Sequence, residues 1–223
     1  VSQNKNSSTT STSNGTSENV HKKWYLMMSP EKAIVISIRP EHALNILNGS
    51  KTLELRKSVP KDFVGWVYVY VTKGKPLLVR MFGRYTLSDR RIEDLGDFTL
   101  SGKIVARFWF DEYKTLEYRK KNKVLMWDNN YYYYTEEDNT YRNVQWILDE
   151  LRLEHQQVLD YGKEKDLYAW HIKKLEIFDK PMQLGGFKKE EYAVMPNGVF
   201  PCYQPLTHGP QSWQYAYILG AKQ

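Results

Sequence analysis

The segment Ala33–Ser58 constrains the fold of this chain most, because it combines a strand, a helix and a second strand with almost no linker between them. From Ile34 to Arg39, isoleucines alternate with Val, Ser and Arg, which is the pattern of a strand with a polar end. Pro40 suits the first position of a helix, and Gly49 suits the left-handed residue that ends one. The sequence therefore predicts a strand, a short helix and a second strand.

The predicted second strand carries a concentration of reactive side chains. Its period of two places two leucines toward a core and Thr52, Glu54 and Arg56 together on the opposite face, close to Lys51 and Lys57. These groups suit a cleft, since Arg56 can fork onto a phosphate or a carbonyl, and Glu54 can accept a hydrogen bond or carry a proton. The alternative interpretation is a salt bridge between Glu54 and Arg56 on an exposed strand face, worth less than about 1 kcal/mol.

Composition excludes several classes of protein. The 223 residues carry a formal charge of +6, which permits a polyanionic partner without requiring one. Cys202 is the only cysteine, and the five histidines lack metal-ligand spacing, so we expect no disulfide, no metal and no cofactor. With no export signal or long apolar run, the sequence predicts a soluble, cytoplasmic protein.

The chain is expected to form one domain with additions. Residues 1–28 are rich in Ser, Thr and Asn and predict a disordered tail. Residues 29–223 predict a single domain, with a charged, tyrosine-rich insertion at about 114–142 that forms a loop or a short hairpin. Within the domain we expect a helix from Asn143 to about Leu159 and a Pro- and Gly-rich loop from Lys180 to Pro210. Further strands are predicted at Trp66–Thr72, Leu77–Phe82, Lys103–Tyr113, Leu167–Ile177 and Trp213–Leu219. The pattern alone indicates an α+β fold.

Three motifs, in order along the chain, resemble those of the ASCH domain family, which is related to PUA and EVE modules. The first is the segment described above, with matches at Ser37, Ile38, Pro40, Ala43, Gly49, Lys51, Thr52, Glu54, Arg56 and Lys57. The others are Tyr168–Pro181 and Pro210–Tyr215. The resemblance implies a PUA-like mixed β pseudobarrel of five to six strands with flanking helices. It also implies a cleft lined by the second strand and by Ser37 and Arg39 at the end of the first.

The leading functional hypothesis is binding of RNA or of a modified nucleotide in that cleft, with no membrane partner. Aromatic rings would stack on bases, and the resemblance places Trp170, Trp213 and Tyr215 on strands near the cleft. The predicted nucleic-acid-binding residues are Ser37, Arg39, Lys51, Thr52, Glu54, Arg56, Lys57, Trp170, Trp213 and Tyr215.

Two other classes of function remain open. Members of the resembled family suggest a metal-independent ribonuclease, in which Lys51 and Glu54 would be catalytic. They also suggest an amidohydrolase of acetylated cytidine, although its K-x-x-T spacing is not kept, because Glu54 stands where the threonine would be. The third hypothesis is a protein-interaction module that binds a partner through the 114–142 insertion.

Overall fold

The computed structural model describes residues 30–119, 124–127, 145–196 and 198–219. The expected tail lies outside these residues, as does most of the expected insertion. The helices are α2 (Pro40–Leu47), α3 (Ile92–Leu95), α4 (Gln145–Leu151) and α5 (His155–Gly162). The strands are β1 (Glu31–Ile38), β2 (Leu53–Arg56), β3 (Gly65–Val71), β4 (Leu77–Met81), β5 (Arg84–Ser88), β6 (Ile104–Phe110), β7 (Tyr113–Arg119), β8 (Val124–Trp127), β9 (Leu167–His171), β10 (Lys173–Met182), β11 (Phe187–Met195), β12 (Gly198–Pro205) and β13 (Trp213–Ile218).

The main sheet has seven strands in the order β10-β6-β3-β1-β13-β11-β12. Central strand β1 runs parallel to β3 and antiparallel to β13, so it is buried on both faces. The isoleucines of β1 join one core with the valines of β3, while Val35 joins a second core with Tyr68 and Tyr70. This two-sided burial explains why β1 is apolar from Ala33 to Ile36.

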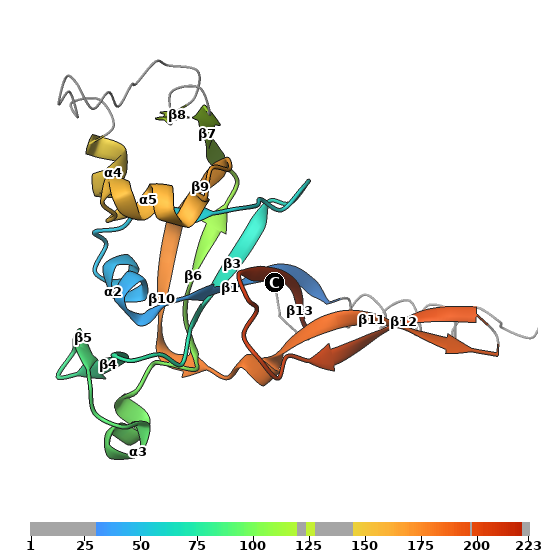
Figure 1. The fold of residues 1–223 in the computed structure, drawn as a ribbon. Helices are drawn as coiled ribbons and strands as arrows, with labels where there is room; N and C mark the ends of the chain where they lie inside the picture. The colour runs from blue at the N-terminus through green and yellow to red at the C-terminus, as the bar shows by residue number, and fades with distance from the viewer. Residues whose placement is uncertain (1–29, 120–123, 128–144, 197, 220–223) are drawn as a thin grey trace, which may run out of the picture.

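A second sheet, in the order β2-β9-β7-β8, stands beside the first and carries α4 and α5 (Figure 1). Leu53 and Leu55 of β2 pack with Ile147 and Leu151 of α4 and with Val158 of α5. Glu54, on the opposite face of β2, is also buried. Strand β2 is therefore enclosed on both sides, and the exposed strand face considered from the sequence is not present.

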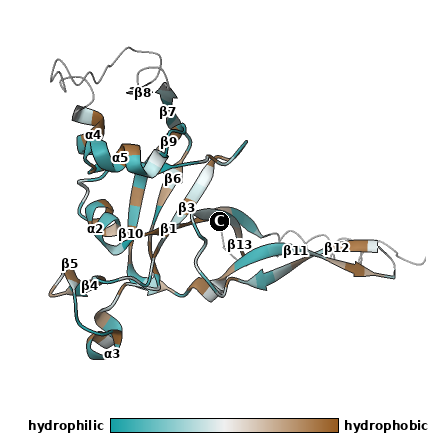
Figure 2. Cartoon of the chain, in the orientation of Figure 1, coloured by the Kyte–Doolittle hydropathy of each residue, from teal (hydrophilic) through white to brown (hydrophobic). Residues whose placement is uncertain are grey.

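Strands β11 and β12 form a hairpin that projects from the main sheet (Figure 1). The sequence predicted a loop over Lys180–Pro210, and that prediction was wrong. Pro201 and Pro205 are tolerated because β12 is an edge strand, where a missing backbone donor breaks no ladder. Figure 2 shows that the outer end of the hairpin is hydrophobic, and Val194 there is 84% exposed.

The expected helix from Asn143 to about Leu159 is two helices. After α4, Arg152 adopts a left-handed backbone with a φ of 53°, which ends the helical path. Glu154 then caps α5: its side chain accepts from the backbone of Gln157, whose side chain accepts from the Glu154 backbone N–H at 2.8 Å. The apolar period continues across the break, so periodicity alone concealed it.

The α+β class is confirmed, with mixed sheets and flanking helices. Among the described residues the strands number more than the five or six expected, and they divide into separate sheets that do not close into a barrel. Within the insertion, β7 and β8 pair as a hairpin. In the part of the chain that is described, no helix has the length and hydrophobicity needed to cross a bilayer.

Candidate functional site

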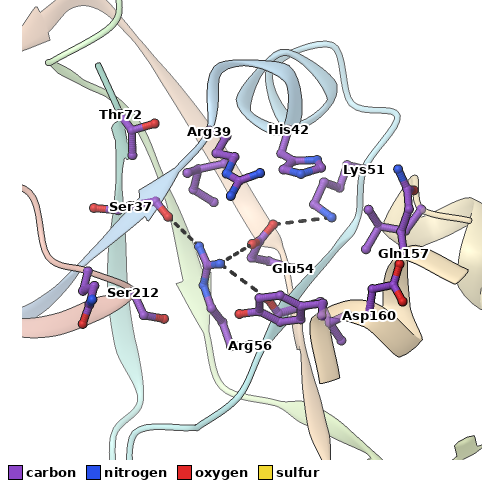
Figure 3. A pocket seen from close by; sticks show the side chains of 15 residues that line it. Ser37, Arg39, His42, Lys51, Glu54, Arg56, Thr72, Gln157, Asp160 and Ser212 are labelled. Carbon is purple, nitrogen blue, oxygen red and sulfur yellow. Dashed lines mark hydrogen bonds and ion pairs between the residues drawn. The ribbon is translucent and has the colours of Figure 1, made fainter. Parts of the chain in front are cut away.

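A cavity of about 520 Å³ opens where the end of β1, the start of α2, strand β2 and helix α5 meet. Figure 3 shows His42, Lys51 and Glu54 on one side of it and Gln157 and Asp160 of α5 on the other. Its lining comprises Ser37, Ile38, Arg39, His42, Lys51, Glu54, Leu55, Arg56, Thr72, Leu153, Gln157, Asp160, Tyr161, Gln211 and Ser212. Segments far apart in the sequence therefore build one site.

The backbone around Ser37 holds the end of β1 in place. The N–H of Ser37 donates to the carbonyl of Ser212 at 2.9 Å, and the N–H of Thr72 donates to the carbonyl of Ile38 at 2.9 Å. Gly209 allows the 206–212 loop to lie this close, because a Cβ there would overlap the ring of Tyr70 and come within 3.1 Å of Ser37 Oγ. The loop before β13 thus forms one wall of the cavity.

Lys51, Glu54 and Arg56 form a buried ion cluster at the base of the site (Figure 3). Glu54 lies 3.4 Å from Lys51 Nζ through one carboxylate oxygen and 3.1 Å from the Arg56 guanidinium through the other. Lys51 Nζ also donates to the carbonyl of Leu151 at 2.6 Å, and Arg56 donates to the carbonyl of Ser37 at 2.7 Å. The cluster connects β1, β2 and the end of α4.

Burial and pairing shift the titration of these groups. Burial alone would raise the pKa of Glu54, but the attraction of Lys51 and Arg56 outweighs it, so the pKa lies below its usual value and the carboxylate stays ionised. The pKa of Lys51 is lowered, chiefly by burial and against the attraction of Glu54. The pKa of His42 is likewise lowered by burial, which favours a neutral imidazole at the cavity wall.

Three buried polar atoms of the lining residues have no hydrogen-bond partner within the described residues: Ser37 Oγ, Arg56 Nε and Glu54 Oε2, of which the last keeps its ion pair with Lys51. Such groups cost about 1 to 3 kcal/mol each when left unpaired. Arg39, by contrast, is exposed at the cavity and forms no ion pair among the residues described. The site therefore retains hydrogen-bonding capacity that the protein itself does not use.

The structure brings together five of the residues predicted from sequence as ligand contacts: Ser37, Arg39, Lys51, Glu54 and Arg56. Thr52 lies outside the lining, with its backbone N–H bonded to the carbonyl of Glu150. Lys57 also lies outside it, with Nζ 4.9 Å from the ring centroid of Tyr161, which does line the cavity.

The predicted aromatic platform does not line the cavity either. Trp170 is completely buried and packs against Phe110 and Trp213, so no ligand reaches its ring in this structure. Trp213 donates to Ser58 Oγ at 3.0 Å, and Tyr215 donates to the carbonyl of Lys61 at 3.2 Å. The three rings belong to the core and its margin.

Sequence reasoning missed the wall supplied by α5, which consists of Gln157, Asp160 and Tyr161. The spacing i, i+3, i+4 places these side chains on one helical face. That signal was available, but nothing in the sequence indicated that the face would meet β2. Tyr161 is the one Phe, Tyr or Trp in the described lining.

Within the described residues, no group of three or more His, Cys, Asp or Glu side chains could hold a metal ion. The cavity lining contains three basic residues, Arg39, Lys51 and Arg56. It contains two acidic residues, Glu54 and Asp160. The described lining therefore carries a modest positive excess of charge.

No family model matches the chain, and no curated protein matches it. Among solved structures, the crystal structure of ASCH from Zymomonas mobilis is 14% identical, with a TM-score of 0.41, over 82% of this chain and 86% of that chain. A mutant form of the same protein is 15% identical, with a TM-score of 0.41, over 83% of this chain and 90% of that chain. The chain is similar, at low identity and with a low TM-score, to these structures of ASCH.

Proposed function

We propose that the cavity beside the buried ion cluster binds a nucleobase or nucleotide of RNA, including a modified one. The observation that carries the proposal is the set of unused polar groups around the cavity: buried Ser37 Oγ and Arg56 Nε, with exposed Arg39 beside them. A volume of about 520 Å³ falls within the range of small-molecule sites.

The chemistry of the lining matches the parts of a nucleotide. Base edges offer carbonyl and ring-nitrogen acceptors, to which the hydroxyl of Ser37 and the guanidinium of Arg56 can donate. Arg39 is placed to meet a phosphate, and the ring of Tyr161 offers a stacking face. A base must leave its stack to enter such a cavity, so single-stranded RNA is the expected form.

The test is a titration of fluorescently labelled single-stranded RNA, followed by anisotropy at several salt concentrations. We expect Ser37→Ala and Arg39→Ala to weaken binding, with Arg39→Ala also lowering the salt slope by about 0.7, as the loss of one phosphate contact on a single strand does. Lys189→Ala is the matched control, because it removes one positive charge from β11, on the projecting hairpin. Absence of binding to any RNA or nucleotide at low salt would contradict the proposal.

No observation favours the enzymatic alternatives over binding. Both would need Lys51 or Glu54 at the substrate, yet these side chains are only 2% and 6% exposed and are engaged with each other and with Leu151. Ribonuclease and amidohydrolase activities therefore stay predictions, to be tested with labelled RNA and acetylated cytidine against a Lys51→Ala control. The protein-interaction hypothesis depends on an insertion that lies mostly outside the described residues.

A further inference from the structure

The β4–β5 hairpin presents a phenylalanine at its tip that contributes nothing to the fold. Met81 pairs with Arg84, so Phe82 and Gly83 form a two-residue turn, and Phe82 is 98% exposed. Both turn residues have positive φ, 50° and 76°, a geometry that favours Asn-Gly. A phenylalanine here exposes its ring and adopts a backbone conformation that bulky residues rarely take. Neither property stabilises the hairpin, so the ring needs another explanation.

The hairpin and the loop before it are uniformly basic. Residues 73–88 contain no acidic side chain and carry four basic ones, namely Lys73, Lys75, Arg80 and Arg84. Lys73, Lys75 and Arg84 are exposed, and Arg84 stands directly beside the tip. An exposed aromatic ring flanked by unopposed cations is the combination that binds a single-stranded nucleic acid, since the ring stacks on a base and the cations meet phosphates.

The base of the hairpin is firmly anchored. Leu78 and Val79 of β4 are completely buried. Tyr85 and Leu87 of β5 pack against the core that contains the isoleucines of β1 and the valines of β3. The exposed tip is therefore held on a rigid support, which reduces the conformational entropy that the hairpin loses when it binds a ligand.

Helix α2 connects the hairpin to the cavity. Helix α2 packs against both β4 and β5, and the same helix carries His42 into the cavity lining, with Arg39 just before its first residue. In Figure 1, α2 lies between the hairpin and α5, and all three lie on the side of the main sheet away from the projecting β11–β12 hairpin. A strand leaving the cavity past α2 would meet the β4–β5 hairpin.

We infer that the β4–β5 hairpin is a second contact for the RNA whose base occupies the cavity: Phe82 stacks on a neighbouring base, while Arg84, Lys73 and Lys75 contact phosphates. The inference rests on the proposed function of the cavity and adds that the ligand is a strand of several nucleotides. A free nucleotide would use the cavity alone.

The experiment compares a mixed-sequence RNA dodecamer with a mixture of the four ribonucleoside monophosphates as ligands for the full chain. Phe82→Asn removes the ring and suits the turn, so its melting temperature should equal or exceed that of the wild type. We expect it to weaken dodecamer binding about 5- to 150-fold, as the loss of one base-stacking ring does, and to leave mononucleotide binding unchanged. Phe82→Trp keeps a stacking ring and should retain dodecamer affinity. Arg39→Ala should weaken the binding of both ligands.

Each outcome separates the two proposals. Unchanged dodecamer affinity in Phe82→Asn, with weakened affinity in Arg39→Ala, would overturn the hairpin inference and support the cavity. The reverse result, with no mononucleotide binding, would overturn the cavity proposal and support the hairpin as an RNA contact by itself. Sedimentation with anionic vesicles that is lost in Phe82→Asn, while dodecamer affinity is unchanged, would overturn the inference in favour of a membrane surface.

Discussion

Two ion clusters, each of which pairs acidic with basic side chains, lie in different surroundings. The buried ion cluster of Lys51, Glu54 and Arg56 has side chains 2% to 11% exposed. The surface ion cluster, whose side chains are 33% to 44% exposed, consists of Asp111, Glu112, Lys114 and Lys173. Ion-pair distances overlap between the clusters, with 2.9 Å from Lys173 to Asp111 and 3.1 Å from Arg56 to Glu54.

The comparison teaches that burial, and not distance, sets the energetic role of these charges. On the surface, water and salt screen each pair, and removing one partner leaves the other hydrated. In the buried cluster, each charge depends on its neighbours because water does not replace them. The buried ion cluster therefore stabilises the base of the cavity. The surface ion cluster, at the ends of β6, β7 and β10, contributes little to stability.

The largest effect is expected from Glu54→Gln, which leaves Lys51 and Arg56 buried without a counter-charge. Loss of one partner of a buried ion pair costs about 3 to 5 kcal/mol, and we expect a loss of unfolding free energy of that size in urea denaturation at neutral pH. A loss below about 1 kcal/mol would show that the cluster is as solvated as a surface pair.

The next effect is the pH dependence of the loss of unfolding free energy in Glu54→Gln. The folded-state pKa of Glu54 lies below its ordinary value of 4.5, because attraction to Lys51 and Arg56 exceeds the effect of burial. The carboxylate therefore adds stability that is fully present above the unfolded-state pKa and is lost as the pH falls through the folded-state pKa. Denaturation of wild type and Glu54→Gln across the acid range should give curves that converge at low pH. Parallel curves would contradict the assigned direction of the shift.

A smaller loss is expected from Lys51→Met. Glu54 keeps its contact with Arg56 in this variant, but the buried carbonyl of Leu151 loses its donor at the end of α4. An unsatisfied buried acceptor costs about 1 to 3 kcal/mol, and hydrogen exchange should show the loosening first in α4. A loss equal to that of Glu54→Gln would mean that Lys51, rather than Glu54, is the centre of the cluster.

The smallest effect is expected from Glu112→Gln in the surface ion cluster. Its side chain is 44% exposed, and Lys173 keeps its contact with Asp111 at 2.9 Å. The denaturation midpoint should stay within the scatter of replicate wild-type measurements, in low and in high salt. A midpoint shift that approaches that of Glu54→Gln would remove the distinction between the two clusters.

Local pattern was sufficient where neighbouring residues decide the structure. The β1–α2–β2 unit follows from alternation, from Pro40 at the helix start and from Gly49, whose φ of 75° ends it. The ion pair between Glu54 and Arg56 also follows from strand period. Pattern was insufficient for the β11–β12 hairpin, because β11 is rich in charged residues and β12 contains prolines, which are tolerated because β12 is the edge strand.

The sequence by itself placed Glu54 and Arg56 on the cavity side of β2, because a strand fixes the faces of its own side chains. It did not exclude Thr52 from the lining or predict that Leu55 would be part of it. Only the tertiary structure decided that this strand would be covered, since α5 and the 206–212 loop reach it from more than ninety positions away. Tertiary packing also buried Trp170 and brought Tyr161 to the cavity. Burial depends on which elements meet, and long-range contacts of that kind leave no periodic trace in the sequence.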